Sequence, residues 1–159
     1  MAVRAELKVQ GIEKLQEKLM QKYEAIKRML DQRLLQLAED AVTYSKENKE
    51  YSDHTANLKN SISFALYYDG NLITMHEGKI PQPDATPKGQ AIVSENLQNY
   101  AAQDGVVAEK GYSLVIVAGM NYGPYVERKG YNVLYLTRYF LLDELKEIVG
   151  EALDIARTA

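Results

Sequence analysis

Two adjacent pairs of residues in this sequence could take part in acid–base chemistry. Asp53 precedes His54, and His76 precedes Glu77. A carboxylate can orient a histidine that acts as a general base, but neighbours in sequence seldom point at one target. Asp53-His54 lies among polar residues typical of helix ends, which favours a capping role. His76-Glu77 lacks the i, i+4 spacing of two zinc-binding histidines on a helix, which favours a strand end facing solvent.

The composition excludes several catalytic chemistries. The chain has no Cys and only 2 His, which rules out thiolate nucleophiles, disulfides, thiolate zinc sites and His-rich metal centres. No Gly-x-Ser-x-Gly elbow is present, and Lys88-Gly89 is not followed by the Ser or Thr of a phosphate-binding loop. Carboxylates are plentiful, but nothing in the sequence selects a catalytic pair. We therefore predict no enzyme, no catalytic residue, no cofactor and no metal, with a small carboxylate-dependent hydrolase as the alternative.

The charge balance argues against tight binding to nucleic acid. The 159 residues include 19 Lys+Arg and 22 Asp+Glu, a net charge of −3, and the basic residues are not clustered as phosphate binding requires. A regulatory DNA-binding protein, with a basic face hidden by the neutral total, is a second alternative. The first residues, with Arg4, Glu6 and Lys8, do not form a signal peptide, and no apolar run approaches the ~20 residues of a membrane-spanning helix. We expect a soluble protein of a reducing cytoplasm, without membrane association.

The first strong pattern along the chain is helical. Apolar residues recur every three or four positions at Ile12, Leu15, Leu19, Tyr23, Ile26, Leu30, Leu34, Leu37, Ala41 and Tyr44. This periodicity predicts a helix over about 12–48, after a short strand or turn at 7–9. At ~1.5 Å per residue the helix would approach ~50 Å, so it must bend, break near 45–50, or project toward a partner. Packing of its stripe on the protein's own sheet is favoured over a coiled coil with a partner.

The next segment predicts a hairpin. Ile62, Phe64 and Leu66 alternate with small or polar residues, as in a half-buried strand. Asp69-Gly70 is a typical two-residue hairpin turn, which makes 71–76 the return strand. The strands together cover about 61–76.

The rest of the chain predicts a loop, a strand and a helix. Residues 77–90 contain three of the 4 Pro and read as a loop, followed by a short helix over 91–103. Residues 112–120 read as the most buried strand, with a turn-rich segment after it and a helix over about 136–157. This order predicts an α+β fold in one domain, 1–159, with an antiparallel sheet packed against a long N-terminal helix and a C-terminal helix.

Tyrosine dominates the aromatic residues, with 12 Tyr beside 2 Phe and no Trp. Half of them fall within 112–139, at Tyr112, Tyr122, Tyr125, Tyr131, Tyr135 and Tyr139. Tyrosine combines a large contact area with a polar tip, and suits both protein–protein interfaces and the wet rim of a core. Both interpretations remain open for this set.

Three segments, in this order, resemble the bacteriophage tail-completion or head–tail joining proteins, also described as neck or minor tail proteins. Residues 9–15, Val-Gln-Gly-Ile-Glu-Lys-Leu, look like the family's opening before a long helix. Residues 55–62, Thr-Ala-Asn-Leu-Lys-Asn-Ser-Ile, are similar to its Thr-Gly-x-Leu-Arg-x-Ser-Ile element. Residues 122–127, Tyr-Gly-Pro-Tyr-Val-Glu, are similar to its Tyr-Ala-x-Tyr-Val-Glu element.

The resemblance implies a structural virion protein of a tailed bacteriophage or prophage that joins head and tail or completes the tail. It implies a homo-oligomeric ring in the virion neck or tail, assembled in the bacterial host cytoplasm with other phage neck and tail proteins. The isolated subunit is expected to be a ring component or, without its partners, a monomer. DNA would pass nearby without specific binding. The residues carried over by the motifs are Thr55, Leu58, Lys59, Ser61, Ile62, Tyr122, Tyr125, Val126 and Glu127.

Each motif has an expected structural role. Thr55 is expected to cap the helical turn that carries Leu58, and Leu58 to fill the core. Ser61-Ile62 should start the strand, and Glu127 should pair with Lys or Arg on the sheet or on a neighbouring subunit. Ala56 departs from the family's Gly, a mild change if that position is helical. Residues 128–131 and 136–140 also differ from the family pattern.

Overall fold

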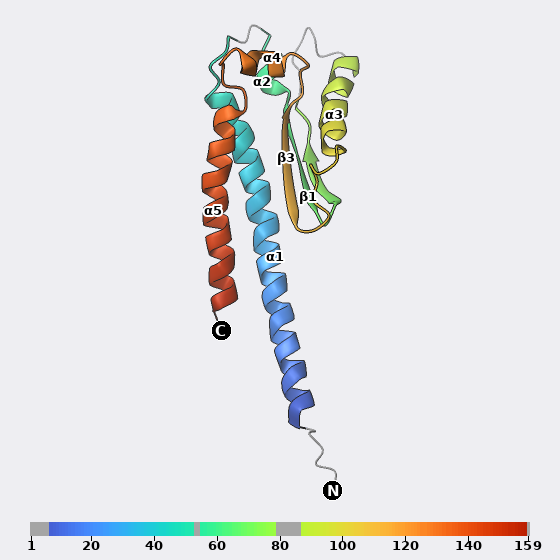
Figure 1. Ribbon diagram of the computed structural model, residues 1–159, viewed down its shortest axis with the longest axis vertical. Coiled ribbons are helices and arrows are strands. Elements are labelled where there is room, and N and C mark those ends of the chain that lie inside the picture. Colours follow the sequence, from blue (N-terminus) through green and yellow to red (C-terminus); the bar gives the residue numbers. More distant parts are fainter. Residues whose placement is uncertain (1–6, 53–54, 79–86, 159) are drawn as a thin grey trace. The chain divides into compact units, whose positions relative to one another are not determined.

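The computed structural model describes residues 7–52, 55–78 and 87–158, and confirms the predicted α+β fold (Figure 1). The elements, in chain order, are α1 (Leu7–Glu47), α2 (Asn57–Asn60), β1 (Ile62–Tyr68), β2 (Asn71–His76), α3 (Pro87–Ala101), β3 (Tyr112–Ala118), α4 (Gly123–Arg128) and α5 (Tyr135–Arg157). The chain forms two compact units. The first contains residues up to Arg33 and from Leu145 on, and the second contains Leu34–Glu144.

The second unit contains a three-stranded sheet in the order β2-β1-β3, with antiparallel pairing on both sides of β1. The predicted hairpin is confirmed. Asp69 and Gly70 have φ angles of 48° and 77°, as a type I′ turn requires at both central positions. The pairing shifts between Leu66 and Tyr67, which leaves Ile73 of β2 as an extra residue, a β-bulge.

Strand β1 is the most buried strand, which corrects two predictions. Its first five residues are all buried, so β1 is buried on both faces rather than half-buried, while β3 is mostly half-buried. On one face, Ile62 and Phe64 pack against Ala38 of α1. On the other, Ala65 packs against Leu97 of α3. The sheet of the second unit therefore lies between α1 and α3.

The apolar stripe of α1 is divided between two environments. From Leu34 on, the stripe side chains Leu34, Leu37 and Ala41 are buried in the second unit. The α1 side chains that pack on the sheet are not those of the stripe but their neighbours Ala38 and Val42. In the first unit, the stripe side chains Ile12, Leu15 and Leu19 are more than half exposed. Residues 7–9 are helical rather than a strand or turn, and α1 runs without interruption through the polar segment to Glu47.

The first unit is a pair of helical segments from α1 and α5. Arg33 forms a two-pronged ion pair with Glu151, at 3.2 and 2.9 Å. The ammonium of Lys22 donates to the carbonyl of Ala156 at 3.2 Å. Since these polar contacts are exposed, each contributes at most about 1 kcal/mol to the free energy of unfolding. The buried side chain of Ile148 adds apolar packing.

Two segments predicted as irregular contain helix. The helix α3 begins at Pro87, inside the predicted loop 77–90, because proline at a first helical position gives up only an N–H that has no intrahelical partner. The predicted turn-rich segment contains α4, with Pro124 in its first turn. Residues 79–86 of the loop and the Asp53-His54 pair lie outside the described residues. Within the described residues, no helix is both long and apolar enough to cross a membrane.

Candidate interaction surface

The structure brings two of the three motif segments together in the second unit. Leu58 is 2% exposed, and forms a buried cluster with Tyr51 and Val133 against which Val126 packs. The hydroxyl of Ser61 donates to the carbonyl of Leu58 at 2.7 Å, which closes the α2 turn. As predicted, Leu58 fills the core and the segment at 61–62 starts β1.

The start of α2 differs from the expected cap. The N-cap position is held by Ala56, which has left-handed backbone angles, φ 59° and ψ 10°. Thr55 lies one residue before the N-cap position that was predicted for it. Its hydroxyl accepts a hydrogen bond from the N–H of Asn57, the first residue of α2, at 3.4 Å. The left-handed backbone strains Ala56, because in this conformation the Cβ comes close to the following carbonyl oxygen. Lys59 and Ile62, the other motif residues here, are half-buried and fully buried.

Ala56→Gly is expected to raise the free energy of unfolding by about 1 kcal/mol, because glycine adopts positive φ without steric cost. Urea unfolding followed by circular dichroism measures the change. Ala25→Gly, at an exposed site within α1, is the matched control and should lower stability by about 1 kcal/mol, since glycine is unfavourable inside a helix. A loss at both positions would contradict the strain at Ala56.

Glu127 has a different role from the predicted ion pair with Lys or Arg. Its Oε2 accepts hydrogen bonds from the N–H groups of Val133 and Leu134, at 2.7 and 3.1 Å. These donors lie just before α5, where N–H groups lack intrahelical partners and a negative charge is favourable. Glu127 thus fixes the turn that joins α4 to α5, which passes through Gly130 at φ 87°.

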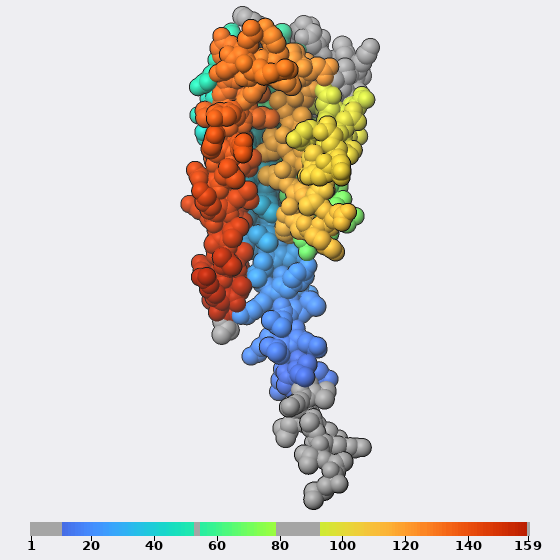
Figure 2. Space-filling view, viewed as in Figure 1, coloured from blue at the N-terminus to red at the C-terminus, as the bar shows by residue number. Residues whose placement is uncertain are grey.

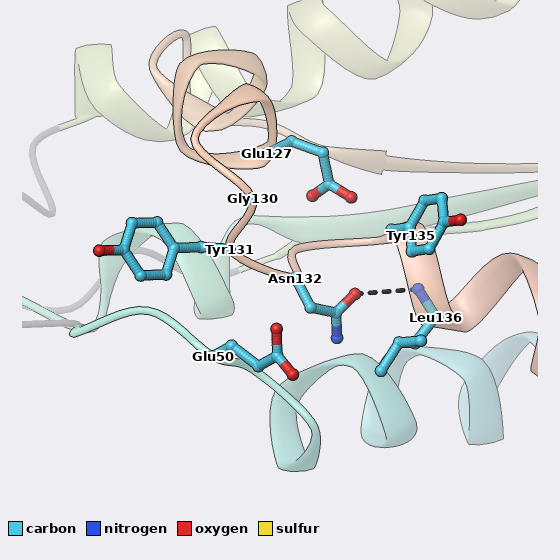
Figure 3. A pocket seen from close by; sticks show the side chains of 7 residues that line it. All are labelled: Glu50, Glu127, Gly130, Tyr131, Asn132, Tyr135 and Leu136. Atoms are coloured by element: carbon cyan, nitrogen blue, oxygen red, sulfur yellow. Dashed lines mark hydrogen bonds between the residues drawn. The ribbon is translucent and has the colours of Figure 1, made fainter.

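Asn132 completes this turn and was missed by the sequence reasoning. The side chain is 4% exposed; its Nδ2 donates to the carbonyl of Asn48 at 2.7 Å. Its Oδ1 accepts from the N–H of Leu136 at 2.9 Å, as the dashed line in Figure 3 shows. One amide therefore ties the end of α1 to the first turn of α5. The sequence held one signal for this role, because Asn is a typical residue just before a helix and Asn132 precedes the apolar run of α5.

A pocket of about 390 Å³ surrounds these residues (Figure 3). It is lined by Glu50, Glu127, Gly130, Tyr131, Asn132, Tyr135 and Leu136. Two carboxylates line it, as a hydrolase would require. However, Oε2 of Glu127 and both polar atoms of the Asn132 side chain already hold backbone groups. Glu127 and Asn132 thus serve to position the polypeptide.

Most of the clustered tyrosines are on the surface. Tyr125 is 61% exposed with Lys129 over its ring at 5.3 Å, and Tyr122 and Tyr131 are also exposed. The Tyr135 and Tyr139 hydroxyls are 3.1 Å apart, and this hydrogen bond, with the charge of Tyr139, raises the pKa of Tyr135. Tyr112 is half-buried against Tyr68. These exposures favour the interface interpretation over the core rim.

A second, apolar groove runs beside strand β3, where α3, β3 and α4 form one face of the second unit (Figure 2). Its volume is about 440 Å³. It is lined by Tyr100, Ile116, Val117, Ala118, Gly123, Pro124, Glu127, Val133, Leu134, Tyr135 and Arg138. Apolar side chains with exposed tyrosines are the usual composition of a protein-binding surface.

The described residues hold no group of three or more His, Asp or Glu side chains that could bind a metal ion. His76 is exposed at the end of β2, as predicted, with its ring 5.7 Å from that of Phe64. Glu77 accepts a hydrogen bond from the hydroxyl of Ser94 at 2.5 Å. Comparison of the chain with protein-family models, curated proteins and solved structures gives no match.

Proposed function

We propose that this protein is a structural virion protein of a tailed bacteriophage or prophage, which joins head and tail or completes the tail as a ring subunit. The observation that carries the proposal is the meeting of two motif segments around Leu58. Val126 of the second segment packs on the cluster of Leu58, although the segments are far apart in the sequence. A shared packing role is a physical reason for the two motifs to occur together.

The conformation of Ala56 supports the same proposal. The family element has Gly at this position, and the backbone here is left-handed, where glycine is the favoured residue. A backbone that favours glycine at position 56 is one that the Gly of the family element would suit, and this supports the proposal.

The exposed tyrosines support a role in assembly rather than catalysis. Tyr122 and Tyr125 of the third motif are on the surface, while Glu127 beside them holds the turn before α5. Tyrosine loses few rotamers on binding, and is enriched in the centre of protein interfaces. A surface of this composition suits permanent contacts between the subunits of a virion.

The proposal is tested by disrupting the coding sequence in the phage or prophage that carries it. Electron microscopy should then show DNA-filled heads and tails that are not joined, or tails with an incomplete end, and the wild-type protein supplied in trans should restore infectious particles. Tyr125→Ala should restore them less well, while its melting temperature stays unchanged. Tyr23→Ala, at an exposed tyrosine of the first unit, is the comparison. Normal infectious virions without the protein would refute the proposal.

A further inference from the structure

Both edges of the sheet in the second unit are open within the described residues. Strands β2 and β3 each pair with β1 alone. Neither strand contains Lys, Arg, Asp, Glu or Pro, the residues with which natural proteins usually protect an edge from pairing. Apart from the β-bulge at Ile73 of β2, the two strands lack such protection, and an open edge is a place where another chain can add a strand.

The hydrogen-bonding groups of the β3 edge face outward. The N–H of Gly119 donates to the carbonyl of Ser61 at 3.0 Å, so odd-numbered residues of this segment face β1. Backbone groups alternate sides along a strand, so the N–H and C=O groups of Leu114, Ile116 and Ala118 point away from the sheet.

The apolar groove lies along this outward edge. Ile116, Val117 and Ala118 line it from β3, Tyr100 from α3 and Tyr135 from α5. An added strand would therefore find unpaired backbone groups at the edge and apolar walls on both sides. This combination is the geometry of strand addition, in which the backbone supplies affinity and the walls supply specificity.

We propose that the β2 edge of a second copy of this chain docks on the β3 edge, so that the sheet continues from copy to copy. Strand β2 exposes Leu72 and Ile73, at 52% and 44%, which fit an apolar groove. Both β2 and β3 are antiparallel to β1, and so run in the same direction. A second copy in the same orientation therefore pairs its β2 with β3 in parallel.

The charges at the end of the groove match this alignment. Parallel pairing brings the end of β2 in one copy beside the end of β3 in the other, and Glu77 directly follows β2. Arg138 lines the groove together with Ala118, the last residue of β3. The contact therefore puts the carboxylate of Glu77 in one copy near the guanidinium of Arg138 in the next. Because the contact joins two different surfaces of the chain, it is head-to-tail, and repeated contacts of this kind generate rings or filaments. The pairing of β2 with β3 is inferred from the sheet itself, and only the closure of the assembly into a ring rests on the proposed function.

The test is self-association of the full-length chain, measured by sedimentation velocity over a concentration series. The wild type should self-associate, and Ile73→Lys should weaken association by about tenfold or more, because a lysine on an edge strand blocks pairing. Because Ile73 is 44% exposed and lies outside the buried core, this variant should keep a melting temperature close to that of the wild type. Glu95→Lys, at an exposed position of α3, is the control and should associate like the wild type.

A charge exchange distinguishes the proposed contact from any other. Arg138→Glu and Glu77→Lys should each associate more weakly alone, because like charges then meet at the groove. An equimolar mixture should recover association, since every contact in alternating copies joins opposite charges. A wild type that stays monomeric, an unchanged Ile73→Lys, or a mixture without recovery would overturn the inference. The proposed function fails separately, if virions form normally without the protein.

Discussion

Leu58→Ala is expected to lower the free energy of unfolding by about 3 kcal/mol, because it removes a buried side chain and leaves a cavity. Leu58 is 2% exposed and joins α2 to Tyr51 and Val133. Its Cδ1 also lies beside Gly123, so closely that a Cβ there would be only 3.3 Å away. The surrounding backbone is held by hydrogen bonds, which limits collapse into the cavity.

Urea unfolding measures this loss as a lower midpoint at an unchanged slope. Leu142→Ala, the same substitution at an exposed position of α5, is the control and should change stability by less than about 0.5 kcal/mol. Equal losses at the two positions would show that Leu58 does not anchor the motif. Leu58→Met should recover most of the stability, since its volume is nearly conserved.

Gly78→Ala is expected to lower the free energy of unfolding by about 3 kcal/mol or more, because the added methyl group overlaps the backbone of Asn60 and Ser61. A Cβ at Gly78 would overlap the carbonyl oxygen of Asn60 and the backbone of Ser61. The N–H of Gly78 also donates to the buried hydroxyl of Ser63 at 2.9 Å. Backbone atoms cannot rotate away as a side chain can, so the segment after β2 must move and break this hydrogen bond.

The control for Gly78 is the same substitution where there is room. A Cβ at Gly150, within α5, would meet nothing within 4 Å. Gly150→Ala should raise the free energy of unfolding by about 0.5–1 kcal/mol, because alanine is the better helix former. Thermal and urea unfolding of both variants should give changes of opposite sign. A neutral Gly78→Ala would contradict the close approach described here.

Local signals in the sequence predicted the elements well. The hairpin follows from Asp69-Gly70, whose conformational preference acts within four residues. The helix over 136–157 follows from periodicity, and differs from α5 by one residue at its start. Periodicity identifies a helical face, however, and not what covers it. For this reason the stripe of α1 was assigned as a whole to the sheet, although Ile12 and Leu15 are exposed.

The candidate site could be predicted only in part, because its contacts depend on distant residues. The motifs located Leu58 and Glu127, but the partners of Glu127 are N–H groups of a turn that forms only when α4 and α5 are in place. Asn132 contacts Asn48, and no local pattern connects them. The left-handed backbone at Ala56 was also missed, since alanine is usually a helix former.

The most buried strand was misassigned for a similar reason. Residues 114–117, Leu-Val-Ile-Val, are more continuously apolar than β1, which carries Ser63. Yet β1 is central, because it pairs with strands on both sides. Ser63 is tolerated there because its hydroxyl donates to the carbonyl of Ser61 and accepts from Gly78. Strand order depends on long-range pairing, which composition does not report.

The central position of β1 also bears on the order in which the sheet folds. Its pairing with β2 needs only a two-residue turn, and isolated hairpins form in about 1–10 μs. Its pairing with β3 must wait until the chain has closed a long loop that includes α3, at a larger entropic cost. During this interval the hairpin exposes a second edge, that of β1 itself. The pairing of β1 with β3 is therefore the step of sheet formation that carries the larger loop-closure cost.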